Sequence, residues 1–225
     1  MYLKEIYLYP DIMDFGKTIT FSFKRESRSL CNYIERHLKK MKCQTINFKK
    51  ICFVCQKEPL FETYINSCNV LCVSIFMNEA DYITCSKDSL NSYFIDLLTI
   101  GIEKCSTTHF LSKDEMIYAI DNFKNDRYIN EWIFKKKRSH KYKIDCIVKC
   151  QLSIDEFTLD IELKQQLKTI CRENVITDIP NEYVFNYHLK DILLIDDEIV
   201  IINKMNETIY SKKITEIPQL STPEV

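Results

Sequence analysis

Four cysteines have the spacing of a metal site. Cys52, Cys55, Cys68 and Cys72 follow the pattern C-x2-C-x12-C-x3-C, which matches a four-thiolate zinc site. Three of them lie in the segments ICFVCQK and NVLCVSIFM, and Cys68 directly precedes the second; both segments are rich in strand-forming residues. In a strand, Cys52 and Cys55 point to opposite faces, and Cys68 and Cys72 lie about 13 Å apart, too far for two Zn–S bonds of about 2.3 Å. We therefore expect buried thiols and no bound metal, unless Cys55 and Cys68 lie in turns.

Other residue types that could do chemistry form no recognisable site. The four histidines, His37, His109, His140 and His188, are dispersed along the chain. The two glycines, Gly16 and Gly101, are too few for a phosphate-binding loop, a dinucleotide-binding turn or a nucleophile elbow. We predict no catalytic residue and no cofactor. A cysteine nucleophile with a distant histidine is left open, because such residues meet only in the fold.

Two sets of charged residues could instead bind a partner. The basic set is Trp132, Lys135, Lys136, Lys137, Arg138 and Lys141, within the run WIFKKKRSHKYK. It could hold nucleic acid by phosphate contacts and stacking, or it could be a solvated loop with Trp132 and Phe134 in the core. The acidic set is Asp160, Glu162, Asp191, Asp196, Asp197 and Glu198. It could steer a protein partner, or it could form solvated hairpin tips and an outer sheet face.

Composition limits the class of protein. The chain has 225 residues, 46% of them hydrophobic, enough for one large core or two modest ones. A formal net charge of −1 makes a nucleic acid a less favoured partner than a protein, because proteins that bind nucleic acid normally carry a basic excess. Charged residues interrupt the N-terminus and every long apolar run, which predicts a cytoplasmic protein without a membrane span. The eleven cysteines are then expected to be reduced.

Hydrophobic periodicity predicts an α+β fold. The N-terminal half is expected to be mixed α/β with about three helices: one over residues 20–41, one whose apolar stripe ends at Gly101, and one that starts at Ser112. Gly101 is expected to allow close packing. The C-terminal half is expected to be an antiparallel β-sheet.

Three segments of the C-terminal half carry that sheet prediction. Residues 143–152 and 157–164 alternate strictly and predict a hairpin. Residues 182–190 alternate and predict a strand, and a second hairpin is expected to turn at Asp196 and Asp197. The whole chain, 1–225, is expected to form one domain whose sheet the second half continues. The possible subdivision is 1–128 mixed α/β, 129–217 antiparallel β, and 218–225 a tail.

Three short segments suggest a family. KEIYLYPD, LCNYIERHL and NEWIFKKK are similar to segments of small cytosolic immunity proteins from bacterial polymorphic-toxin and contact-dependent inhibition systems. The resemblance implies a compact α+β protein that binds one cognate toxin domain and blocks its substrate cleft or surface, without a cofactor. We therefore expect a binding or inhibitory protein. Three alternatives remain: nucleic-acid binding through residues 132–143, an enzyme with an unrecognised site, and a structural or assembly protein.

Overall fold

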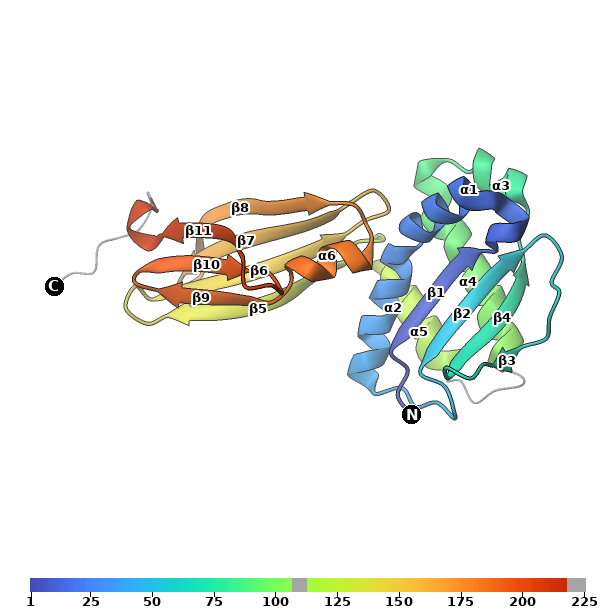
Figure 1. Ribbon diagram of the computed structural model, residues 1–225. Helices are drawn as coiled ribbons and strands as arrows, with labels where there is room; N and C mark the ends of the chain where they lie inside the picture. The colour runs from blue at the N-terminus through green and yellow to red at the C-terminus, as the bar shows by residue number, and fades with distance from the viewer. Residues whose placement is uncertain (107–112, 218–225) are drawn as a thin grey trace. The chain divides into compact units, whose positions relative to one another are not determined.

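The computed structural model describes residues 1–106 and 113–217. The chain divides into two compact units, Met1–Asn130 and Glu131–Val225 (Figure 1). Helices and separate sheets are both present, so the predicted α+β class is confirmed. The predicted continuation of one sheet through both halves is wrong, because the strands of each unit pair only with one another. Within the described ranges, no helix is long and apolar enough to cross a membrane.

The first unit contains a mainly parallel sheet. Its strands are β1 (Glu5–Pro10), β2 (Lys50–Gln56), β3 (Tyr64–Ile65) and β4 (Val70–Phe76), in the order β1-β2-β4-β3. β1, β2 and β4 are parallel, and β3 runs antiparallel to β4. Alternate side chains of β1, such as Ile6 and Leu8, are fully buried, whereas their neighbours are half-buried. One face of the sheet therefore forms the core of this unit.

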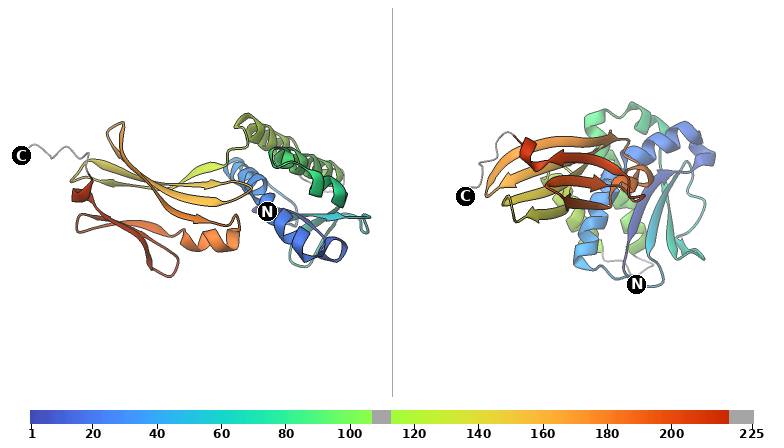
Figure 2. Two further views of the ribbon diagram at one scale, coloured as in Figure 1. Left: turned by 90° about the horizontal axis from the view of Figure 1, so that it is seen from above. Right: turned by 60° about the vertical axis from the view of Figure 1, so that its left-hand side comes forward.

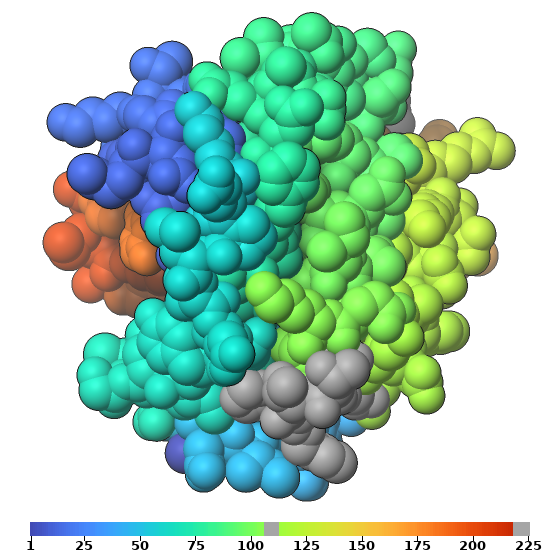
Figure 3. Space-filling model, turned by 90° about the vertical axis from the view of Figure 1, so that its right-hand side faces the viewer, coloured from blue at the N-terminus to red at the C-terminus, as the bar shows by residue number. Residues whose placement is uncertain are grey.

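Helices supply the other side of that core. They are α1 (Ile12–Glu26), α2 (Arg28–Met41), α3 (Glu79–Thr84), the 3-10 turn η1 (Lys87–Ser89), α4 (Leu90–Ser106) and α5 (Lys113–Asn125). Figure 1 shows α4 and α5 behind the sheet and α2 beside β1. Figure 3 shows the green helical layer packed directly against the cyan and teal strand layer. About three helices were expected, and the described part of this unit contains five α-helices.

The predicted single helix over residues 20–41 is wrong, because the chain changes direction at Ser27. α1 ends at Glu26 and α2 begins at Arg28. The Ser27 hydroxyl donates a hydrogen bond to the backbone oxygen of Leu8, 2.9 Å away, which fixes this break against β1. The apolar stripe continues across the break, so periodicity alone could not reveal it. The helix expected from Ser112 begins at Lys113, and Ser112 lies outside the described residues.

Side chains of α2 close the free edge of β1. Glu35 Oε1 accepts a hydrogen bond from the Ile6 backbone N–H at 2.6 Å, and Arg28 Nη1 donates one to the Ile6 oxygen at 2.9 Å. Arg28 and Glu35 also form an ion pair, with side chains only 5% and 9% exposed. The N–H and C=O of Ile6, which could otherwise pair with another strand, are thus satisfied within the unit.

Replacing Arg28 with Met should destabilise the protein by about 3–5 kcal/mol, because Glu35 would remain as a buried charge without its ion-pair partner. Urea unfolding followed by circular dichroism measures this loss. The control is Lys113→Met, which removes an exposed ion pair with Glu103, whose side chains are 41% and 53% exposed. That change should cost less than about 1 kcal/mol.

A double variant separates the ion pair from the edge contacts. Arg28→Met with Glu35→Leu removes both charges but leaves the Ile6 N–H and C=O without their side-chain partners. We expect it to stay less stable than wild type by about 1–3 kcal/mol. Full recovery of stability would contradict a role of these side chains at the strand edge.

Gly101 lets α4 approach the sheet closely, as expected from the sequence. A Cβ built at this position would lie 2.3 Å from Cδ1 of Phe53 in β2. Phe53 is fully buried, so its ring has no free space to move into. The absence of a side chain at residue 101 therefore sets the spacing between helix and sheet.

Gly101→Ala should lower the free energy of unfolding by about 1–3 kcal/mol, because overpacking outweighs the better helix propensity of alanine. Thermal and urea unfolding measure the change. Combining Gly101→Ala with Phe53→Leu should recover part of the loss if the ring is the obstacle. An equal loss in both backgrounds would contradict this contact as the cause.

The second unit is built from two antiparallel sheets. One contains β5 (Glu131–Ser139), β6 (Ile144–Leu152), β7 (Phe157–Gln165) and β8 (Lys168–Asp178) in that order. The other contains β9 (Asp191–Ile195), β10 (Glu198–Ile202) and β11 (Thr208–Lys213), with β10 in the middle. The left view of Figure 2 shows them as two layers. Their inner faces share one buried cluster that includes Val148, Ile161 and Ile201.

Both predicted hairpins of this unit are confirmed. β6 and β7 pair from Leu152 with Phe157 to Ile144 with Gln165, and β9 and β10 pair around the turn at Asp196 and Asp197. The alternation along the first hairpin therefore assigned its inward and outward faces correctly.

The strand predicted over residues 182–190 is wrong. Glu182–His188 form a helix, α6, whose first turn is capped by Asn181 accepting a hydrogen bond from the Tyr183 N–H. Phe185 of this helix is buried and stacks on Phe157 at 4.4 Å between ring centroids. One aromatic anchor and a good N-cap thus outweigh the alternating pattern.

Candidate partner-binding surface

The structure separates the four cysteines that have zinc spacing. Cys52 and Cys55 lie on opposite faces of β2, and Cys72 in β4 is the register partner of Cys52. Cys68 lies in the turn before β4, whereas Cys55 lies within β2 and not in a turn. Burial, assisted by the neighbouring Cys72, raises the pKa of the Cys52 thiol to about 11. At neutral pH this thiol is protonated and a poor nucleophile.

In the part of the chain that the structure describes, other metal-binding side chains form no cluster either. Across residues 1–106 and 113–217, no group of three or more His, Cys, Asp or Glu side chains could hold a metal ion. His37 stacks on Tyr33 in α2, and His188 contacts Asp178 at 3.2 Å. His109 lies outside the described residues.

The basic set lies on a strand rather than in the predicted loop. β5 contains Trp132 to Ser139, and the ring of Trp132 lies 6.3 Å from that of Phe157. Trp132 and Phe134 pack against the core cluster, as one of the two interpretations of this run required. Lys141 follows β5 in the turn before β6. Strand pairing with β6 therefore positions these cations.

Every cation of the basic set lies within ion-pair distance of a carboxylate. Lys135 lies 2.9 Å and Lys137 3.9 Å from Asp191. Lys136 lies 3.2 Å and Arg138 3.6 Å from Asp145, and Lys141 pairs with Asp197. Residues of the predicted acidic set thus neutralise part of the predicted basic set.

The acidic set divides between three places. Asp160 and Glu162 lie on the outer face of β7, Asp191 lies beside Lys135, and Asp196, Asp197 and Glu198 form the turn from β9 into β10. Asp160 accepts hydrogen bonds from Arg172 at 3.1 Å and Asn174 at 2.9 Å. The acidic set therefore does not form one surface. The alternation of β7 directs the carboxylates of Asp160 and Glu162 away from the core of the unit.

Parts of both sets meet in one depression, which we call the hairpin hollow. It encloses about 420 Å³ and is lined by Arg138, Ser139, His140, Lys141, Leu194, Asp196, Asp197, Glu198 and Ile214. Its charged walls come from the β5–β6 and β9–β10 turns. Sequence reasoning missed His140, Leu194 and Ile214, and nothing in their spacing indicates that they share a site.

Local interactions hold the acidic wall of the hairpin hollow in place. Asp196 and Asp197 both have left-handed backbone conformations, with φ of 46° and 67°, as a two-residue hairpin turn requires. The Asp197 backbone oxygen accepts a hydrogen bond from the Ile214 N–H at 2.9 Å. Hydrogen bonds from Lys141 and then Tyr142 hold the pKa of Asp197 below its ordinary value. Asp196 has no cationic partner within the described ranges, so its charge is available to a ligand.

Comparison with known proteins adds no relative. No family model matches the chain, and neither does any curated protein or solved structure. The resemblance to immunity proteins stays a prediction.

Glu162 is the most strongly held carboxylate of the acidic set. Its side chain is 10% exposed and lies 2.9 Å from Lys149 Nζ and 3.2 Å from Lys164 Nζ. Thr169 donates a further hydrogen bond at 2.7 Å. Burial opposes ionisation, but the hydrogen bonds from Lys149, Thr169 and Lys164 outweigh it and lower the pKa to about 2. Glu162 therefore stabilises the outer sheet face and is a poor candidate for partner binding.

Glu162→Gln should lower the free energy of unfolding by about 1–3 kcal/mol at pH 7. Because the folded pKa lies below the unfolded value of 4.5, the advantage of wild type is complete above about pH 5 and disappears as the pH falls toward 2. Urea unfolding at several pH values measures this difference. The exposed Glu156→Gln on the β6–β7 turn is the control, and a pH-independent loss in Glu162→Gln would contradict the assignment.

Proposed function

We propose that this protein binds and inhibits a protein partner in the bacterial cytoplasm, as an immunity protein does with its cognate toxin domain. The hairpin hollow is the proposed contact surface. It combines carboxylates, ammonium groups and the apolar side chains of Leu194 and Ile214 in one depression. Charged and polar side chains beside apolar ones are the usual composition of a protein interface.

We favour a protein partner over a nucleic acid because the cations of the basic run are paired with carboxylates. Each of its five cations has a carboxylate within 4.0 Å. A phosphate would therefore have to compete with a carboxylate that the fold already holds in position. A mixed-charge surface of this kind suits a partner with matching charges of both signs, because complementarity fixes orientation and steers the encounter.

In the proposed mechanism the partner brings a basic side chain to Asp196 and Glu198 at the tip of the β9–β10 hairpin. The Lys141–Asp197 pair then fixes the neighbouring wall, so little of this surface must become ordered on binding. Inhibition follows from occupying the substrate cleft or surface of the toxin domain. The protein needs no cofactor and performs no turnover in this mechanism.

The partner test is co-expression with the toxin domain encoded by a neighbouring gene. We expect a 1:1 complex by size-exclusion chromatography with light scattering, together with loss of toxin activity. Absence of a toxin gene nearby would count against the proposal. Salt-sensitive binding to single-stranded DNA that is lost in Lys135→Ala/Lys136→Ala/Lys137→Ala would favour the nucleic-acid alternative instead.

Asp196→Asn with Asp197→Asn should slow association with a basic toxin domain by about threefold to tenfold at low salt. Asparagine accepts a left-handed backbone, so the turn is retained while its charge is removed. Stopped-flow fluorescence or surface plasmon resonance measures the association rate. Asp155→Asn with Glu156→Gln makes the same charge change on the β6–β7 turn and should have little effect. An unchanged rate in the Asp196/Asp197 variant would remove this hairpin from the interface.

A further inference from the structure

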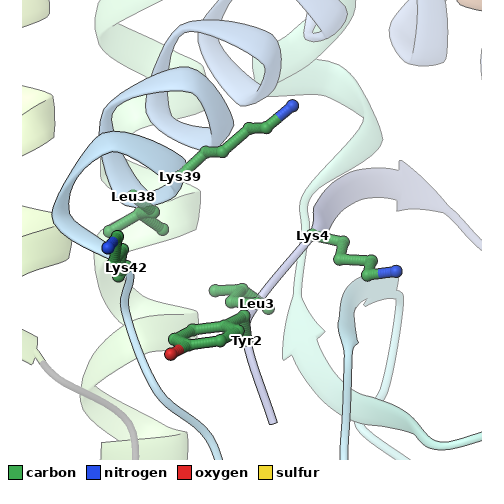
Figure 4. Close-up of a pocket in the computed structure, with 6 residues that line it drawn as sticks. All are labelled: Tyr2, Leu3, Lys4, Leu38, Lys39 and Lys42. Atoms are coloured by element: carbon green, nitrogen blue, oxygen red, sulfur yellow. The ribbon is translucent and has the colours of Figure 1, made fainter.

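A depression in the first unit suggests a further binding site, which does not depend on the proposed function. It lies between the N-terminal residues and the end of α2, and we call it the N-terminal hollow (Figure 4). It encloses about 580 Å³, within the usual range for small-molecule sites. Its lining residues are Tyr2, Leu3, Lys4, Leu38, Lys39 and Lys42.

Backbone hydrogen bonds fix both sides of the N-terminal hollow. The Leu3 N–H donates to the Cys43 oxygen at 3.1 Å, and the Thr45 N–H donates to the Met1 oxygen at 2.7 Å. Tyr2 forms an antiparallel bridge with Gln44. The N-terminal segment is therefore tied to the chain that follows α2, and the hollow is formed before any ligand binds.

The lining combines an apolar floor with a cationic rim. Leu3 and Leu38 are buried, whereas the Tyr2 ring is 54% exposed. Lys4, Lys39 and Lys42 are exposed, and none of the three has a carboxylate within 4.0 Å in the described part of the chain. No lining residue is acidic. This arrangement favours a ligand that is anionic at one end and flat and apolar at the other.

The end of a helix normally disfavours an anion, because its free carbonyl groups are partly negative. Here the last turn of α2 is closed by a Schellman motif. The Cys43 N–H bonds to the Leu38 oxygen at 3.1 Å, and the Lys42 N–H bonds to the Lys39 oxygen at 3.3 Å. These carbonyl groups already have partners, and the lysines supply the positive charge.

Figure 4 distinguishes the roles of the three lysines. Lys39 and Lys42 extend from the end of α2, on the side of the hollow opposite Tyr2 and Leu3, whereas the Lys4 side chain leads away from the helix. Figure 4 shows the ammonium groups of Lys39 and Lys42 apart from each other. Both side chains are exposed and flexible, so each can turn toward an anionic group at the end of α2. A flat ring could lie on Tyr2 above the leucines.

We propose that the N-terminal hollow binds an organic phosphate with a flat ring, of the nucleoside monophosphate class. Lys39 and Lys42 bind the phosphate, and Tyr2 stacks on the ring over Leu3 and Leu38. Phosphate alone lacks the apolar contact, and a nucleoside alone lacks the charge. Both parts are therefore needed for full affinity.

Isothermal titration calorimetry with adenosine monophosphate, adenosine and inorganic phosphate tests this site. We expect adenosine monophosphate to bind saturably and at least tenfold more tightly than either part. Lys42→Asn and Lys39→Gln should each weaken it at least fivefold, and Tyr2→Ala should reduce its advantage over phosphate. Lys40→Gln removes the same charge from an exposed position of α2 that does not line the hollow, and it should have little effect.

Stability measurements keep loss of binding separate from loss of folding. Lys42 has a left-handed backbone with φ of 55°, a conformation that asparagine and glycine adopt more easily than lysine. Lys42→Asn should therefore unfold at the same or a higher temperature than wild type while binding less. Absence of saturable binding by adenosine monophosphate, or equal weakening by Lys40→Gln, would overturn the proposal.

Discussion

The buried ion pair between Arg28 and Glu35 is the interaction on which the first unit depends. The two side chains join α2 to the edge of β1, where they form hydrogen bonds with both the N–H and the C=O of Ile6. With this edge closed, the helices pack over one face of a sheet whose other face is only half-buried along β1. Parallel sheets are usually covered on both faces. The edge contacts thus help to hold a sheet that has less cover than usual.

Charge in the second unit is organised by the same rule of local compensation. The lysines and arginine of β5 and the following turn face Asp145, Asp191 and Asp197, which lie on three other segments. Most of the charge that appears segregated along the sequence is therefore balanced in space. Of the predicted acidic set, Asp196 and Glu198 at the tip of the β9–β10 hairpin have no cationic partner within the described ranges. The surface that could select a partner is smaller than the charge runs suggest.

Sequence reasoning succeeded where one local pattern determines one local structure. Strict alternation predicted the β6–β7 hairpin with its inward and outward faces, and Gly101 marked a close helix contact. It failed where a distant contact decides the outcome, as with the break at Ser27 or the helix anchored by Phe185. The hairpin hollow could not be predicted from the sequence for the same reason. Lys141 and Asp197 are far apart in the chain, and only the packing of the two sheets of the second unit brings them together.

The scarcity of glycine leaves a cost in the turns. Ten described residues other than glycine have positive φ, among them Lys42, Lys143, Gln166 and Asp197. Five of them are Asn or Asp, which adopt this conformation readily, whereas it costs each of the others, such as Lys42, about 1–2 kcal/mol relative to the right-handed form. This protein therefore stores conformational strain at loop positions away from its cores. Directed evolution for heat resistance would find its improvements in those loops first, and could reach them without altering either hydrophobic core.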